Sequence, residues 1–131
     1  MIDSMAKFRL GAHHLNVAVG RRAGPNRKPY SQRLCSRCHA AQVDDEMHMV
    51  FECSAFDSIR NHRYFTELFE STAESKDMDG FIHNNDVRKV AYFVDICLRA
   101  IDSINMNLYI SDALRHFHFV GQAARRLAVP M

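Results

Sequence analysis

The chain has 131 residues, a length that allows one small domain, and its 47% hydrophobic and 10% aromatic content is ordinary for a globular protein. The formal net charge is only +2, but residues 1–39 carry a net charge of +7 and the remainder carries −5. No run approaches about 18 apolar residues and the first residues lack a secretory pattern, so we expect no membrane partner and an intracellular protein, in the nucleus or an organelle.

Residues 1–19 form the first predicted segment. The spacing of Met5 and Phe8 predicts a helix over about 2–10, and Gly11 interrupts it. A looser stretch with partly strand-like alternation should follow and end at Gly20. We expect the adjacent histidines of this stretch, His13 and His14, to be solvated or to act as capping residues.

Residues 20–33, GRRAGPNRKPYSQR, have the composition of a basic linker with no hydrophobic period. Such a run either remains a solvated loop or folds on a polyanion. Tyr30 and Phe8 are candidates for stacking on bases. The candidate nucleic-acid-binding residues are the basic ones in and just after this linker: Arg21, Arg22, Arg27, Lys28, Arg33 and Arg37.

The strongest motif is C-x2-C-x9-H-x4-C, formed by Cys35, Cys38, His48 and Cys53. Thiolate and imidazole donors at these spacings are typical of tetrahedral zinc, and four protein ligands close the site, so we expect one structural Zn2+. Residues five apart on a helix lie roughly 140° apart. We therefore expect His48 on a short helical turn, started by the acidic residues Asp44 to Glu46, and Cys53 just past its end.

Other interpretations of these cysteines are weaker. A disulfide framework requires an oxidising compartment, and a redox C-x2-C pair usually lies in a βαβ unit that the sequence does not show. His39, beside Cys38, is a spare donor that could replace His48. Cys97 lies in an apolar helical pattern and is expected to be a buried free thiol. Residues 33–60 contain few apolar side chains, so folding there should depend on the metal.

After the motif, Ser54 is expected to cap a helix over about 55–70, with Arg60 and Arg63 facing solvent or phosphate. Its buried side should comprise Phe56, Ile59, Phe65 or Tyr64, Leu68 and Phe69. Residues 71–80 are polar and small and are expected to form a mobile loop.

The clearest amphipathic pattern lies in residues 86–104, capped by Asn85 or Asp86. It predicts a helix for the core or for a protein partner, with an apolar stripe of Val87, Val90, Ala91, Val94, Cys97, Leu98, Ile101 and Ile104. Residues 34–105 are thus expected to form the zinc module with its helices, and residues 106–131 a tail. That tail is expected to hold a helix from Ser111 or Asp112 to Ala128, with Leu114, Phe117 and Val120 inward.

Residues 6–60 resemble the C-terminal zinc-binding region of non-LTR retroelement reverse transcriptase polyproteins, and the stretch DVRKVAYFVDICLRAI extends the similarity to about residue 101. The matching positions are Lys7 to Gly11, Gly20, Arg21, Arg33 to Cys38, Val43, Asp45, Glu46, His48, Cys53, Phe56 and Arg60. The resemblance implies a nucleic-acid-binding zinc module without polymerase activity, derived from a retroelement.

The sequence thus predicts a mainly α, zinc-stapled domain with a following helix pair, which binds RNA in preference to duplex DNA and is not an enzyme. No polymerase signature and no glycine-rich phosphate loop occurs in the chain. A structural or adaptor subunit of a larger ribonucleoprotein, such as an organellar ribosome, is the alternative. In that case the helix over 86–104 would dock on a protein partner.

Overall fold

The structure is a computed structural model that describes residues 2–70 and 77–128, and it confirms the mainly α prediction. The α-helices are α1 (Ile2–Leu10), α2 (Asn16–Arg21), α3 (Asp57–Arg60), α4 (Glu67–Glu70), α5 (Met78–His83), α6 (Val87–Asp102) and α7 (Met106–Ala128). The shorter turns are the 3-10 helices η1 (Gly24–Asn26), η2 (Tyr30–Gln32) and η4 (Ser54–Phe56) and the π-helical turn η3 (His48–Glu52). Within the described ranges the β-structure is a single antiparallel bridge between Leu34 and Val43. No helix of these ranges is long and apolar enough to cross a membrane.

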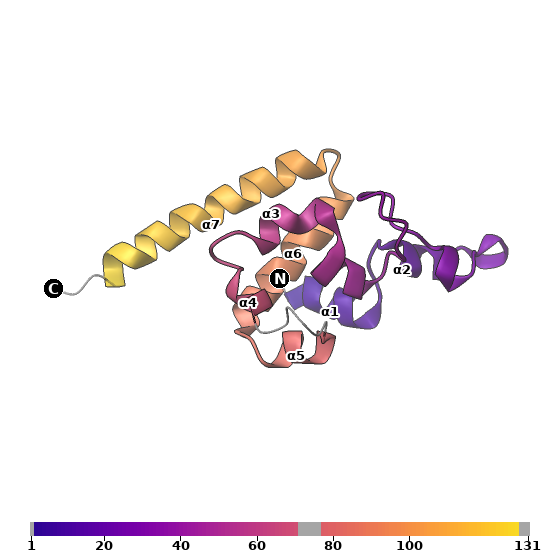
Figure 1. Ribbon diagram of the computed structural model, residues 1–131, viewed down its shortest axis with the longest axis horizontal. Coiled ribbons are helices and arrows are strands. Elements are labelled where there is room, and N and C mark those ends of the chain that lie inside the picture. Colours follow the sequence, from indigo (N-terminus) through magenta and orange to yellow (C-terminus); the bar gives the residue numbers. More distant parts are fainter. Residues whose placement is uncertain (1, 71–76, 129–131) are drawn as a thin grey trace.

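Helix α6 is the centre of the fold, because both α1 and α7 pack against it (Figure 1). Asp86 caps its start, accepting hydrogen bonds from the backbone N–H groups of Arg88 at 2.8 Å and Lys89 at 3.3 Å. The middle of the predicted apolar stripe is buried, as expected, but its two ends are not. Val87 is exposed, and Ile104 lies beyond the end of the helix and is fully exposed.

A cluster of phenylalanines fills the space between α6 and the short helices. Phe65 and Phe93 meet edge to face with ring centroids 6.0 Å apart, and Phe69 stacks on Phe81 at 5.5 Å. Helices α4 and α5 have four and six residues, too few to be stable alone in water. They are therefore held by the burial of these rings, which interact favourably in such geometries.

The continuous helix predicted over 55–70 is wrong. The segment is divided into η4, α3 and α4, and Ser54 lies inside η4 without capping α3. The chain turns after α3, where the His62 ring accepts a hydrogen bond from the Tyr64 N–H at 3.1 Å and the Phe65 N–H binds the His62 carbonyl at 2.9 Å. Such local bonds compete with the helical pattern. The predicted buried side is nonetheless correct, with Phe56, Ile59, Phe65 and Leu68 fully buried.

Two further boundaries differ from the prediction. Of the expected loop over 71–80, residues 71–76 lie outside the described residues, and residues 78–80 belong to α5, which is anchored by the buried ring of Phe81. Helix α7 begins at Met106 instead of residue 111, because the Asn105 side chain accepts a hydrogen bond from the Leu108 N–H at 3.1 Å. Leu114 and Phe117 face inward as predicted, whereas the Val120 side chain lies outside the described ones.

Residues 16–21, expected to be loose and partly strand-like, form α2. Its first two N–H groups bind one residue of the metal motif: Asn16 donates to the Asp44 carboxylate at 2.8 Å and Val17 to the Asp44 carbonyl at 3.2 Å. Val17 and Ala18 are buried. The helix therefore begins through a tertiary contact that hydropathy spacing does not reveal.

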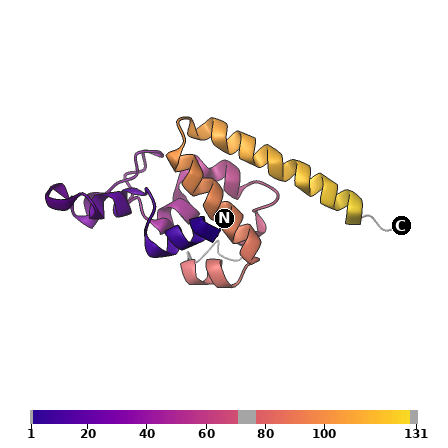
Figure 2. The same ribbon diagram turned by 180° about the vertical axis from the view of Figure 1, so that it is seen from behind.

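The segment from α2 to η2 protrudes on one side of the helical body, and α7 leaves on the opposite side (Figures 1 and 2). We call residues 20–33 the basic arm. It carries Arg21, Arg22, Arg27, Lys28 and Arg33, and every one of its residues is exposed or half-buried. The arm thus lies outside the core, as its composition predicts.

Candidate metal centre

The four predicted ligands meet in one cluster. The donor atoms of Cys35, Cys38, His48 and Cys53 all lie within 4.8 Å of one another. The Cys35 sulfur is 3.8 Å from the Sγ atoms of both Cys38 and Cys53, and the Nε2 atom of His48 is 3.2 Å from the Cys38 sulfur. Cys35, His48 and Cys53 are buried. Four converging donors shielded from water in this way can hold a metal ion.

The first two ligands lie on a tight turn. The bridge between Leu34 and Val43 closes it, and the Cys35 N–H donates to the Gln42 carbonyl at 2.8 Å. Inside the turn the Arg37 N–H points at the Cys35 sulfur at 3.4 Å. His39, with a left-handed φ of 59°, is exposed and outside the cluster, so His48 is the histidine of the site.

The second two ligands lie at opposite ends of η3. The Asp45 carboxylate accepts a hydrogen bond from the His48 N–H at 2.8 Å, which confirms the expected acidic start of this turn. The Cys53 N–H then binds the His48 carbonyl at 2.7 Å, an i→i+5 bond. This wide π-type turn brings Cys53 back to the side of His48, where an α-helix would separate the two.

Burial shifts the pKa values of two members of the cluster in opposite directions. It lowers the pKa of His48, which keeps the imidazole neutral and able to ligate, and it raises the pKa of Cys53 to about 12. Burial also acts to raise the pKa of Cys38, but hydrogen bonding with the Ala40 backbone and with the Cys35 side chain outweighs it and lowers that pKa. A bound cation would deprotonate all three thiols, since a coordinating thiol ligates as the thiolate.

Arg37, one of the predicted nucleic-acid ligands, is committed to the protein interior. Its guanidinium forms an ion pair with Asp44, which is fully buried, and it lies over the Phe56 ring at 5.5 Å from the centroid. Burial acts to lower the pKa of Arg37, but the Asp44 carboxylate and the nearby Cys35 and Cys53 sulfurs raise it. The side chain is only 14% exposed, so it supplies positive charge beside the cluster.

Arg60 was expected to face solvent or phosphate, and this is wrong. It is 8% exposed and donates hydrogen bonds to the carbonyls of Met49 at 2.9 Å and Val50 at 3.0 Å, and to the Cys53 carbonyl. Asp57 balances its charge at 2.9 Å. The arginine therefore connects α3 to the backbone of η3 and Cys53, which we call the ligand-bearing turn because it carries His48 and Cys53. Arg63, by contrast, is exposed as predicted.

His13 also differs from the prediction, whereas His14 is exposed as expected. The His13 ring is buried, with Nε2 2.7 Å from the Glu46 carboxylate, while Nδ1 accepts a hydrogen bond from the Leu15 N–H at 3.3 Å. Its hydrogen bond lowers the pKa of Glu46. This pair joins the start of the ligand-bearing turn to the segment before α2.

The basic residues of the arm differ in whether their side chains form hydrogen bonds with the rest of the protein. Arg22 donates to the His13 carbonyl at 2.7 Å and Arg33 to the Val17 carbonyl at 2.9 Å, and Arg21 donates to the Gly11 carbonyl at 3.0 Å. Arg27 and Lys28 are exposed, and within the described part of the chain their side chains form no hydrogen bond or ion pair.

Of the two aromatic candidates for stacking, Phe8 is buried and unavailable, which corrects the prediction. Tyr30 is 53% exposed, and its hydroxyl donates to Asp45 at 2.8 Å. Its burial and this acidic partner raise the pKa of Tyr30 to about 12. Tyr30 is therefore the only aromatic residue that the described arm offers for stacking.

Fold and site together define a small helical domain whose described residues include one Cys3His cluster able to hold a metal ion, with a protruding basic arm. Comparisons of the chain with models of protein families, with curated proteins and with solved structures returned no match.

Proposed function

We propose that the cluster binds one structural Zn2+ and that the domain it stabilises binds single-stranded RNA through the basic arm, without catalysis. Three thiolates and one imidazole are a donor set typical of structural zinc, and they leave no position open for substrate. Zinc with three thiolates carries one net negative charge. The guanidinium of Arg37, which is paired with the buried Asp44, lies beside the cluster and adds positive charge next to these thiolates.

The observation that best supports RNA binding is the exposed positive charge of the arm, which no acidic residue of the same segment balances. Between Asp3 and Asp44 the chain has no acidic residue, and the segment protrudes from the body where a long strand can reach it (Figure 1). Phosphate contacts supply most non-specific affinity for nucleic acids. We assign these contacts to Arg21, Arg22, Arg27 and Lys28, because Arg37 is paired with Asp44 and Arg33 lies against α2.

The resemblance to the zinc-binding region of retroelement polyproteins supports the same proposal and would make the domain retroelement-derived. It fits a location where RNA is available, the nucleus or an organelle.

Replacing Arg21, Arg22, Arg27 and Lys28 together by Ala tests the proposal. Each phosphate contact contributes about 0.7 to the log–log salt slope of binding to a single strand. The variant should therefore flatten the slope for a single-stranded RNA oligonucleotide by roughly three. The measurement is fluorescence anisotropy between low and moderate salt, with zinc content and circular dichroism as checks of folding.

A matched control removes the same charge elsewhere. Arg63, Arg88, Arg99 and Arg115 are exposed arginines outside the arm, and their joint replacement by Ala should leave the slope close to that of the wild type. Equal slopes in all three proteins would contradict the assignment of RNA binding to the arm.

One observation favours the adaptor function as a second candidate. An apolar groove of about 590 Å³ lies between α1 and the first turn of α6, and its edges Leu10 and Val87 are 76% and 71% exposed. This groove is where a protein partner would meet the helix over 86–104, since the central part of that helix is already covered. Absence of RNA binding in the wild-type protein would favour this candidate.

A further inference from the structure

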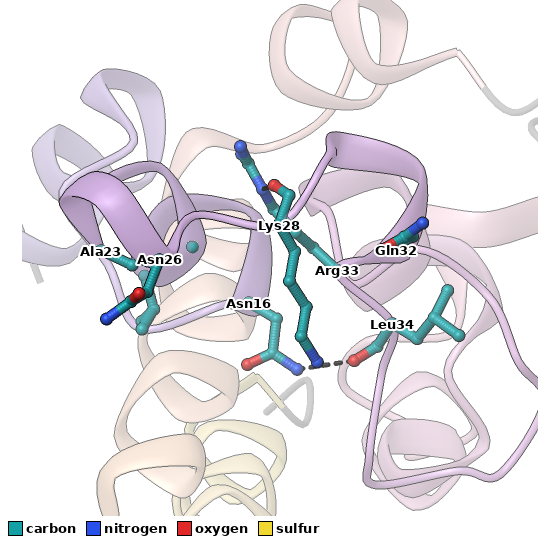
Figure 3. A pocket seen from close by; sticks show the side chains of 9 residues that line it. Asn16, Ala23, Asn26, Lys28, Gln32, Arg33 and Leu34 are labelled. Atoms are coloured by element: carbon teal, nitrogen blue, oxygen red, sulfur yellow. Dashed lines mark hydrogen bonds between the residues drawn. The ribbon is translucent and has the colours of Figure 1, made fainter.

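A pocket at the base of the basic arm suggests a more specific role, which rests on the proposed RNA binding and deepens it. We propose that this pocket receives one unpaired nucleotide of the RNA and reads the edge of its base. It lies between α2 and the two 3-10 turns of the arm (Figure 3). The lining residues that bear on the proposal are Val19, Asn26, Lys28, Gln32, Arg33 and Leu34.

The pocket gathers polar side chains that have no partner in the protein. Within the described chain the amides of Asn26 and Gln32 and the ammonium of Lys28 form no side-chain hydrogen bond or ion pair, and all three residues are exposed. Figure 3 shows Asn26 on one side of Lys28 and Gln32 on the other. Amides supply both donors and acceptors, which suits a base edge, whereas a lysine suits a phosphate.

The same pocket offers apolar surface to a base. Val19 and Leu34 are 43% and 41% exposed although both are aliphatic. The cavity volume is about 440 Å³, within the range of small-molecule sites of about 300–1,000 Å³. Apolar walls, amides and a cation in one pocket match the three parts of a nucleotide: the face of the base, its edge and its phosphate. No acidic residue lines the pocket, so nothing there repels a phosphate.

Hydrogen bonds within the protein hold the walls of the pocket in place. Arg33 crosses its floor against Gly20, where an added Cβ would lie 2.7 Å from the Arg33 Cδ atom. Arg33 is fixed there by bonds to the Lys28 carbonyl at 3.0 Å and the Val17 carbonyl at 2.9 Å. Elsewhere in the lining the Asn16 amide donates to the Leu34 carbonyl at 2.6 Å. Fixed walls reduce the entropy lost on binding.

The two prolines of the arm also restrict the conformation of the pocket. Pro25 lies within η1, next to Asn26, and Pro29 precedes η2, which ends at Gln32. Proline fixes its own φ and restricts the residue before it. Both amides are therefore presented from stiffened turns, as base readout requires, while Arg21, Arg22 and Arg27 bind phosphates without regard to sequence.

The test compares zinc-loaded wild-type protein with Asn26→Ala/Gln32→Ala on single-stranded octamers of adenosine, cytidine and uridine, measured by fluorescence anisotropy. The wild type should prefer one octamer by about 10-fold, the discrimination expected of a good amide–base pair. In the double variant this preference should disappear, with the salt slope unchanged. Gln42→Ala/Asn107→Ala, which removes two exposed amides outside the pocket, should keep the preference.

The possible results separate the two proposals. A steep salt slope combined with a base preference that survives in Asn26→Ala/Gln32→Ala, or with no preference in the wild type, overturns the nucleotide pocket and leaves RNA binding by the arm in place. Absence of wild-type binding to all three octamers at low salt overturns the proposed function, and the pocket with it. Loss of preference in the amide variant alone supports both.

Discussion

Removal of the metal should unfold the turn around Cys35 and Cys38 and destabilise the whole domain. The turn is held by one backbone bridge and a few hydrogen bonds, and most of its side chains are exposed. His39 and Ala41 adopt left-handed backbone conformations, which cost free energy. Structural zinc contributes about 10–16 kcal/mol of apparent binding free energy in small domains, comparable with the total stability of a domain. A strong chelator should therefore lower the melting temperature by tens of degrees, as followed by circular dichroism.

The ligand variant Cys53→Ser should lose stoichiometric zinc and behave like the chelated protein. Cys97→Ala is the matched control, because Cys97 is equally buried but lies outside the cluster. It should retain one equivalent of zinc, with a loss of stability limited to what a smaller core side chain causes. Full zinc content in Cys53→Ser, or a melting curve that the chelator does not change, would contradict the assignment.

Replacing Arg60 by Met should lower the free energy of unfolding by about 3–5 kcal/mol. Methionine fills a similar volume but leaves the carbonyls of Met49, Val50 and Cys53 without their shared donor in a buried site. Each buried unsatisfied acceptor costs about 1–3 kcal/mol. Urea unfolding of the zinc-loaded protein measures the loss, which corresponds to a decrease in melting temperature on the order of 10 °C.

Two controls define the origin of this effect. Arg63→Ala removes an exposed arginine three residues away and should change stability by less than about 0.5 kcal/mol. Arg60→Lys keeps the charge but not the planar fork of five donors, and should recover only part of the loss. Equal stability of Arg60→Met and Arg63→Ala would show that the three carbonyl bonds contribute nothing.

The Cys3His cluster and the central helix were predictable because each depends on local spacing. Cys35, Cys38, His48 and Cys53 occur within nineteen residues, and the apolar period of α6 extends over four turns with Asp86 as its cap. What could not be seen was the type of turn between His48 and Cys53. A π-type turn results from an i→i+5 bond, and no preference for particular residues allows it to be predicted from the sequence.

The missed features depend on contacts between distant segments. Arg60 and His13 look like solvated residues in the sequence, and only the chain path shows that each meets an acceptor of the ligand-bearing turn. Asp57, three residues before Arg60, is the one local signal of a paired arginine. The expectation that residues 33–60 have little core was also wrong, since Met49, Val50 and Phe56 are fully buried.

The pocket of the arm escaped prediction for a similar reason. Asn16, Asn26 and Gln32 are spread over seventeen residues of a segment without hydrophobic period, so no spacing rule brings them together. Composition indicates that the segment is exposed, but it does not reveal that Arg33 folds back over Gly20 to form a floor.

Asp44 occupies a position that binds no metal and yet restricts which substitutions the chain can accept. Its carboxylate receives the Asn16 N–H of α2 on one side and the Arg37 guanidinium of the cysteine turn on the other, and none of it is exposed. Asn lacks the charge that Arg37 requires, and Glu is one methylene too long for a fully packed site. A homologue that kept the three cysteines and the histidine but changed Asp44 would retain the four donors. It would lose the contacts through which Asp44 joins the cysteine turn to α2 at the start of the arm.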